Sequence, residues 1–173
     1  MSRSLVLGLA SLICAVSAAA HAQSSRQHLP AIAGVPFGSS FASAQAQLGP
    51  GFKAGTAPKQ PDNRTLTGRI EINGQFYIAN FTFNPAGVLD MIFAVADTPG
   101  GDDDACHAQW GAVRASVDGQ LGPPDTQNDD QATGLASAKY AFKDGSKADA
   151  ARLGCLIAVT YKAGAGKAKT GPK

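Results

Sequence analysis

Alternating apolar and polar residues predict three successive strands, at residues 66–72, 75–83 and 88–95. The dipeptide Asn73–Gly74 separates the first two of them. It is the strongest short hairpin signal, because both central residues of a type I′ turn need a positive φ. We therefore expect an antiparallel meander in this part of the chain.

The same alternation predicts which side chains leave the core. Tyr77, Ala79, Phe81 and Phe83 fall on the face that we expect to be buried, and Leu89, Met91, Phe93 and Val95 share one face of the next strand. The opposite face then carries a candidate binding surface of Arg69, Glu71, Phe76, Ile78, Asn80 and Ile92. An open sheet face with an aromatic among polar groups suits recognition. The alternative is that a loop at residues 52–64 covers Phe76.

Two helices are predicted. Ser39 or Ser40 is a good N-cap for a short helix at residues 40–48, and Gly49–Pro50 ends it. A longer helix follows the three aspartates at 102–104, which complement the positive end of a helix dipole. Its apolar stripe consists of Cys106, Trp110, Val113, Val117 and Leu121.

The C-terminal part predicts two further strands. Residues 137–143 alternate with Tyr140 and Phe142 inward, and a turn at Asp144–Gly145 follows. The apolar face of the last strand consists of Leu153, Cys155, Ile157, Val159 and Tyr161. The polar segments 52–64, 97–104 and 125–133 are expected to be loops.

A short motif occurs twice. Gln-Leu-Gly-Pro at residues 47–50 recurs at 120–123, and each copy ends a predicted helix that strands follow. A tandem duplication with half-repeats 37–96 and 104–162 explains the pattern. Coincidence in a glycine-rich chain is the alternative.

The N-terminus has the three parts of an export signal. Arg3 precedes an apolar run at residues 5–16, and Ala20 and Ala22 place small residues at the cleavage positions. We therefore expect residues 1–22 to be removed, a periplasmic or secreted location, and no integral membrane segment after cleavage. A mobile leader at 23–36, a single α+β domain at 37–162 and a flexible basic tail at 163–173 complete the expected organisation.

Cleavage would leave two cysteines, Cys106 and Cys155, and an even number in an oxidising compartment predicts one disulfide. The bond would pin the long helix to the last strand. The predicted fold class is therefore α+β, a two-layer sandwich with an antiparallel sheet and helices on one face.

Charge and chemistry exclude several classes of function. The mature chain would hold 14 Lys and Arg against 13 Asp and Glu, with no basic footprint for nucleic acid. A serine-type triad is not expected. The mature chain would have two histidines, and His28 lies in the leader, so only His107 remains. No metal or cofactor is expected. His107 with the aspartates at 102–104 is the only set that an enzyme of unrecognised type could use.

The order helix, Leu-Gly-Pro, strands, repeated once, resembles two groups of small exported proteins. One has the secreted β-lactamase-inhibitor-protein-like fold, and the other is the BamE (SmpA/OmlA) envelope family. The matching residues are Phe37-Gly38-Ser39-Ser40 with Leu48-Gly49-Pro50, and Trp110 to Leu121 with Gly122-Pro123-Pro124. The resemblance implies protein binding rather than catalysis.

We therefore expect a non-enzymatic exported protein that binds another exported protein, or is associated with the envelope, with the oligomeric state left open. Inhibition of a secreted or periplasmic enzyme is a special case of this hypothesis. The alternatives are a small enzyme of unrecognised type and a structural envelope component without a ligand.

Overall fold

The computed structural model describes residues 26–97, 102–130 and 132–164. The expected signal at 1–22 and the tail beyond Gly164 lie outside these residues. The first half contains α1 (Phe41–Leu48), β1 (Lys53–Ala57), β2 (Gln60–Ile72), β3 (Gln75–Phe83) and β4 (Leu89–Ala96). The second half contains α2 (Asp103–Leu121), β5 (Thr126–Asp130), β6 (Leu135–Ala141), β7 (Lys147–Leu153) and β8 (Leu156–Lys162).

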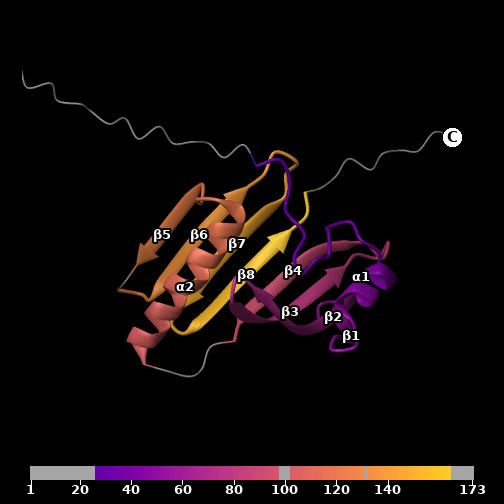
Figure 1. Cartoon of the computed structure of the whole chain (residues 1–173), viewed down its shortest axis with the longest axis horizontal. Coiled ribbons are helices and arrows are strands. Elements are labelled where there is room, and N and C mark those ends of the chain that lie inside the picture. Colours follow the sequence, from indigo (N-terminus) through magenta and orange to yellow (C-terminus); the bar gives the residue numbers. More distant parts are fainter. Residues whose placement is uncertain (1–25, 98–101, 131, 165–173) are drawn as a thin grey trace, which may run out of the picture.

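All eight strands form one antiparallel sheet in the order β1-β2-β3-β4-β8-β7-β6-β5 (Figure 1). Each half is a helix followed by a four-stranded meander, and the two meanders join through their last strands, β4 and β8. The order of strands on one side of this junction therefore mirrors the order on the other. A tandem duplication would give this arrangement, and it stays a prediction.

The expected two-layer sandwich is wrong. Strands account for 49% of the described residues and helices for 20%, so the sheet dominates the structure. The α+β class is only loosely compatible with this sheet-rich structure. The difference arises because β1 and β5 consist of small or polar residues and β7 holds one large apolar residue, Leu153. Pairing with neighbouring strands forms these three strands, rather than an apolar pattern of their own.

Local signals in the sequence are confirmed at three points. Asn73 and Gly74 both have positive φ, at 47° and 80°, and join β2 to β3. The Ser40 side chain accepts a hydrogen bond from the Ser43 amide at the start of α1. The Asp102 carboxylate accepts one from the Ala105 amide at the start of α2.

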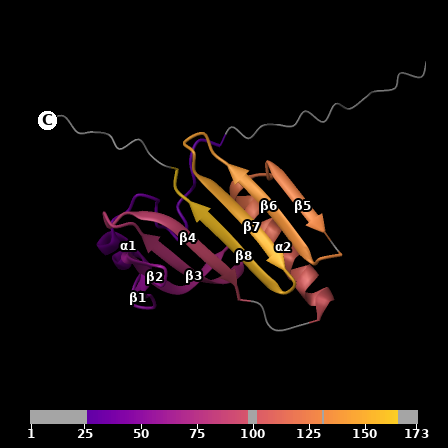
Figure 2. The same cartoon turned by 180° about the vertical axis from the view of Figure 1, so that it is seen from behind.

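The core lies between one face of the sheet and the two helices. Its largest fully buried side chains include Tyr77, Phe81, Phe83, Ile92, Val113, Ile157 and Tyr161. Phe41 of α1 packs edge-on against Phe83 of β3 with 5.1 Å between ring centres. Each buried large apolar side chain contributes about 1.5–3 kcal/mol to stability. Figure 2 shows the opposite face of the sheet, with the helices behind it.

The leader expected to be mobile at 23–36 is docked from Arg26 onward. The Arg26 guanidinium donates hydrogen bonds to the carbonyls of Leu121 and Pro123 and pairs with the Asp125 carboxylate. It also lies over the rings of Tyr140 and Phe142, 5.4 Å from each centre. A polar segment without periodicity reveals neither a single clamping residue nor the site that receives it.

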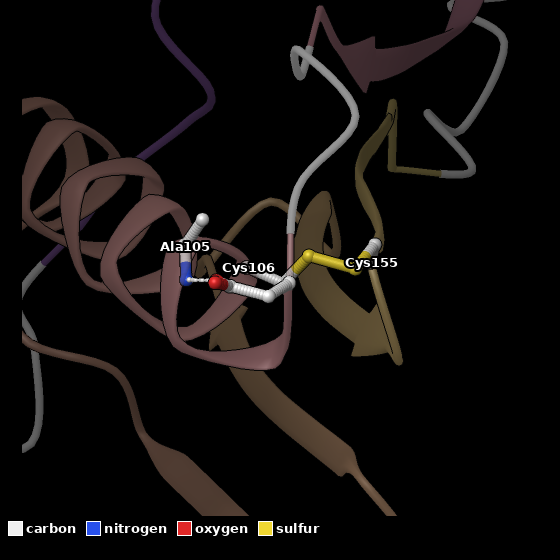
Figure 3. Close-up of a disulfide and its surroundings, with 4 residues drawn as sticks. Ala105, Cys106 and Cys155 are labelled. Carbon is white, nitrogen blue, oxygen red and sulfur yellow. Dashed lines mark hydrogen bonds between the residues drawn. A yellow bond between two sulfur atoms is a disulfide. The ribbon is translucent and has the colours of Figure 1, made fainter.

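The structure places Cys106 and Cys155 at disulfide distance, with their Cα atoms 5.0 Å apart (Figure 3). Cys106 lies in the first turn of α2, as expected. Cys155 lies in the turn between β7 and β8 and not on the apolar face of the last strand. Gly154, with φ of 56°, makes this tight turn and separates Leu153 from β8.

Candidate binding face

The side of the sheet that points away from both helices is its open face (Figure 2). Within the described residues, six large apolar side chains are exposed, namely Phe76, Ile78, Phe93, Leu135, Leu153 and Leu156. All six alternate with buried residues on their strands and therefore lie on the open face. Scattered exposed apolar residues are ordinary, but this gathering on one surface marks a candidate binding site.

Phe76 and Ile78 lie where the sequence predicts them, with 44% and 48% of their surface exposed. No loop covers Phe76, because much of the segment 52–64 forms β1 and the start of β2. The Arg69 guanidinium lies 4.3 Å from the centre of the Phe76 ring and pairs with Asp97 at 2.9 Å. Glu71 lies directly opposite Phe76 on β2.

Asn80 lies on the same face and is half-buried. Its amide donates a hydrogen bond to the Thr67 hydroxyl at 3.0 Å and its carbonyl oxygen accepts one from the Thr82 hydroxyl at 3.1 Å. These bonds use both ends of the amide. Asn80 is therefore held in place beside the apolar side chains and remains a weaker candidate for a new contact than Phe76.

Ile92 does not belong to the candidate surface, because it is fully buried in the core. Phe83 pairs with Leu89 and Thr82 pairs with Met91, so Asp90 is an extra residue in β4. A one-residue bulge moves every following side chain to the other face of the sheet. Leu89 therefore points inward as expected, whereas Met91, Phe93 and Val95 point to the open face in place of Ile92.

The strand registers bring the exposed apolar side chains together. Ile78, Val95, Ala158 and Ala151 form one row across β3, β4, β8 and β7. Leu156, Leu153 and Leu135 form the neighbouring row across β8, β7 and β6. In the other direction the same row passes through Asp97, just after β4, and reaches Phe76 on β3. Asp97 thus lies between Phe76 and Leu156. We call the apolar residues of these two rows the apolar zone: Phe76, Ile78, Val95, Leu135, Ala151, Leu153, Leu156 and Ala158.

Lysines lie at the other end of the open face. Lys147 and Lys162 are directly opposite each other, and Lys139 lies opposite Asp149. Neither Lys139 nor Lys147 belongs to any of the ion pairs found in the described parts of the chain. Burial raises the pKa of the Asp90 carboxyl above its usual range, and the nearby Lys162 opposes that rise. The open face thus combines an apolar zone with lysines at its other end, two of which have an aspartate nearby.

The leucines of the apolar zone could not be placed from the sequence. Leu153 and Leu156 flank the turn at Gly154–Cys155, and the sequence pattern assigned Leu153 to the buried face of one continuous strand. Their exposed fractions are 62% and 57%. The signal that could have revealed them is the Gly154–Cys155 pair read as a two-residue hairpin turn, which divides the segment into two strands.

A separate cavity of about 710 Å³ lies between the docked leader, the start of β4 and the turn at 144–146. Leu29, Phe37 and Leu89 form apolar parts of its wall, and Asp90 and Asp144 are among its polar residues. Asp144 accepts hydrogen bonds from the amide and hydroxyl of Ser146. Its carboxylate is thus already engaged within its own turn.

The residues proposed for an enzyme of unrecognised type lie at the start of α2. His107 and the aspartates Asp102, Asp103 and Asp104 are all exposed around the first turn of α2, and Asp102 is engaged as the helix cap. Across the described ranges, no group of three or more His, Cys, Asp or Glu side chains could hold a metal ion.

Comparison with known proteins adds no assignment: no family model, curated protein or solved structure matches this chain. Neither helix of the described ranges has the length and apolar character that crossing a lipid bilayer requires.

Proposed function

We propose that this chain is an exported, non-enzymatic protein that binds another exported protein through the open face of its sheet. The observation that carries the proposal is the position of Phe76, Ile78, Phe93, Leu135, Leu153 and Leu156 on that single face. An exposed group of large apolar side chains on one face is typical of protein interaction sites. The Cys106–Cys155 disulfide is compatible with export.

The chemistry of the face defines the partner that it suits. An apolar surface on the partner would cover the apolar zone, and carboxylates at its edge would lie near Lys139 and Lys147. Aromatic and leucine anchors supply most of the affinity in such interfaces, whereas charges at the rim set the association rate and its salt dependence. We expect binding to weaken as ionic strength rises, because these lysines are exposed.

The test is co-purification with the mature, disulfide-bonded chain as bait in an extract of its native compartment, followed by mass spectrometry. Phe76→Ser and Leu153→Ser should each lose the partner without loss of folding, because both side chains are exposed. Gln45→Ser, an exposed substitution on α1, is the matched control and should retain it. A partner retained equally by the wild type and both open-face variants would contradict the proposal.

A further inference from the structure

Arg152 is a buried arginine on the side of the sheet that α2 covers (Figure 1). It alternates on β7 with the exposed Ala151 and Leu153, and only 2% of its own surface is exposed. Cys155, three residues later, is bonded to Cys106 in the first turn of α2, so this part of β7 lies close to the beginning of the helix. An arginine side chain stays protonated in proteins, so the fold buries a full positive charge here.

Two nitrogens of the Arg152 guanidinium group, Nε and Nη2, are buried and have no hydrogen-bond acceptor among the residues that the structure describes. Their N–H groups lie on the same edge of the planar group and point in the same direction. An edge of this kind binds the two oxygens of a carboxylate side by side. A buried charged donor without an acceptor is destabilising, and arginine cannot lose its proton to avoid the penalty. The edge therefore suits a ligand with two neighbouring oxygen atoms.

We propose that Arg152 binds the carboxylate of a small organic acid between β7 and the first turns of α2. The two parallel hydrogen bonds from Nε and Nη2 would fix the orientation of the acid, and its single negative charge would neutralise the guanidinium. This site lies on the opposite side of the sheet from the apolar zone. It does not depend on the proposed function.

The carboxylates of the chain itself do not neutralise Arg152. Asp129 lies in the same row, because it pairs with Ala136 and Ala136 pairs with Arg152, so two strand spacings of about 4.8 Å each separate them. Asp129 is exposed, as are Asp103 and Asp104 in the first turn of α2. None of the three forms an ion pair with Arg152 within the described parts of the chain. The counter-charge is thus left to a group from outside the chain.

The surroundings of Arg152 favour a monocarboxylate over phosphate. Ala136 and Ile157 lie on either side of it in the sheet, and Ala150 precedes it on the same face. All three are fully buried and apolar, so their side chains add no further donor. A phosphate group carries a charge of about −1.5 to −2 at pH 7, more than one guanidinium neutralises. A carboxylate with a short apolar chain matches both the charge and the neighbours.

The edge of the sheet at β5 gives access to this side. Gln127 and Asp129 point to the same side of the sheet as Arg152, yet both are exposed, so α2 does not cover this edge. Between Asp129 and Arg152 the row contains only Ala136, whose methyl group takes up little space. Arg114 of α2 donates a hydrogen bond to Gln127 at 3.3 Å and pairs with Asp118. Its positive charge beside the edge is offset in part by Asp118 and Asp129.

The first experiment is isothermal titration calorimetry of the purified, disulfide-bonded mature chain with sodium butyrate in a chloride buffer at pH 7. The wild type should bind one butyrate with a dissociation constant on the order of 1 mM, well within the limit for a ligand of this size. Arg152→Met removes the charge at similar volume and should abolish binding. Arg152→Lys keeps the charge without the two-donor edge and should weaken binding at least about 10-fold. Arg64→Met removes an exposed arginine of β2 and should bind butyrate like the wild type.

Thermal unfolding supplies a second measurement with the opposite sign for the same variant. In chloride buffer alone, Arg152→Met should melt at a higher temperature than the wild type, because it removes an uncompensated buried charge. Butyrate at about 50 times its dissociation constant should raise the melting temperature of the wild type by roughly 5–9 °C. It should leave that of Arg152→Met unchanged when sodium chloride is used to match the ionic strength.

Several results would overturn the proposal. These are a wild type that binds no butyrate up to about 50 mM, about 50 times the expected dissociation constant, and binding that persists in Arg152→Met. Tighter binding of inorganic phosphate than of butyrate would overturn the assignment to a carboxylate. A lower melting temperature of Asp129→Asn in chloride buffer alone would identify Asp129 as the acceptor in place of a ligand. Partner capture by the open face is not measured in these assays, so their failure leaves the proposed function to its own test.

Discussion

Tyr140 on β6 donates a hydrogen bond to Asp118 on α2, with 2.7 Å between the hydroxyl and carboxylate oxygens. Asp118 also pairs with Arg114 one turn earlier in the helix. This contact ties the long helix to the sheet. Burial, and then the acceptor carboxylate of Asp118, raise the pKa of the Tyr140 hydroxyl above its ordinary value.

The first prediction concerns alkaline stability. Burial also raises the pKa of Tyr77 and Tyr161, so the folded chain favours the neutral form of all three phenols. In the unfolded chain they ionise near pH 10. Their contribution to the free energy of unfolding is therefore complete below about pH 10. It is lost as the pH rises toward the pKa values of these tyrosines in the folded chain. Urea titrations should show the free energy of unfolding falling above about pH 10, and Tyr140→Phe should lessen the slope. A slope unchanged in Tyr140→Phe would contradict this assignment.

The second prediction concerns the disulfide. The bond closes a loop with a sequence separation of 49 residues. A disulfide that closes a loop of this size restricts the unfolded chain, which adds about 4 kcal/mol to the free energy of unfolding. Cys106→Ser with Cys155→Ser, or reduction of the wild type, should lower the melting temperature by roughly 8–16 °C. Equal melting temperatures for the oxidised and reduced protein would show that the bond contributes nothing.

The third prediction concerns the clamp formed by Arg26. Arg26→Ala removes the hydrogen bonds to the carbonyls of Leu121, the last residue of α2, and Pro123, together with the pair with Asp125. A hydrogen bond to a charged group contributes about 1.5–3 kcal/mol, so we expect a loss of about 2–3 kcal/mol in the free energy of unfolding. Chemical denaturation measures it. Lys143→Ala, an exposed change in the turn after β6, is the control. Its free energy of unfolding should lie within about 0.5 kcal/mol of the wild-type value.

The fourth prediction contrasts two glycines. A Cβ atom at Gly68 would lie 2.7 Å from the Phe52 ring, whereas nothing lies within 4 Å of one at Gly111. Gly68→Ala should therefore destabilise the fold by about 1–3 kcal/mol through overpacking. Gly111→Ala in the exposed surface of α2 should stabilise it by about 1 kcal/mol, because alanine favours the helix. The same denaturation assay measures both, and equal signs would contradict the packing described at Gly68.

The sequence predicted elements whose signals are local. The hairpin at Asn73–Gly74, the caps of α1 and α2 and the apolar stripe of α2 depend on residues a few positions apart, and all are confirmed. The disulfide partners were also predicted, because only two cysteines follow the expected signal. The exposure of Phe76 and Ile78 followed from a period of two along one uninterrupted strand.

Tertiary structure alone decided the rest of the binding face. The bulge at Asp90 exchanges Ile92 for Phe93 on the open face, and only pairing with β3 reveals the extra residue. Strands β1, β5 and β7 carry no apolar pattern, so their place in the sheet depends on hydrogen bonds to neighbouring strands. The apolar zone joins residues that are distant in the chain, because side chains become neighbours through register between strands and not through spacing within one strand.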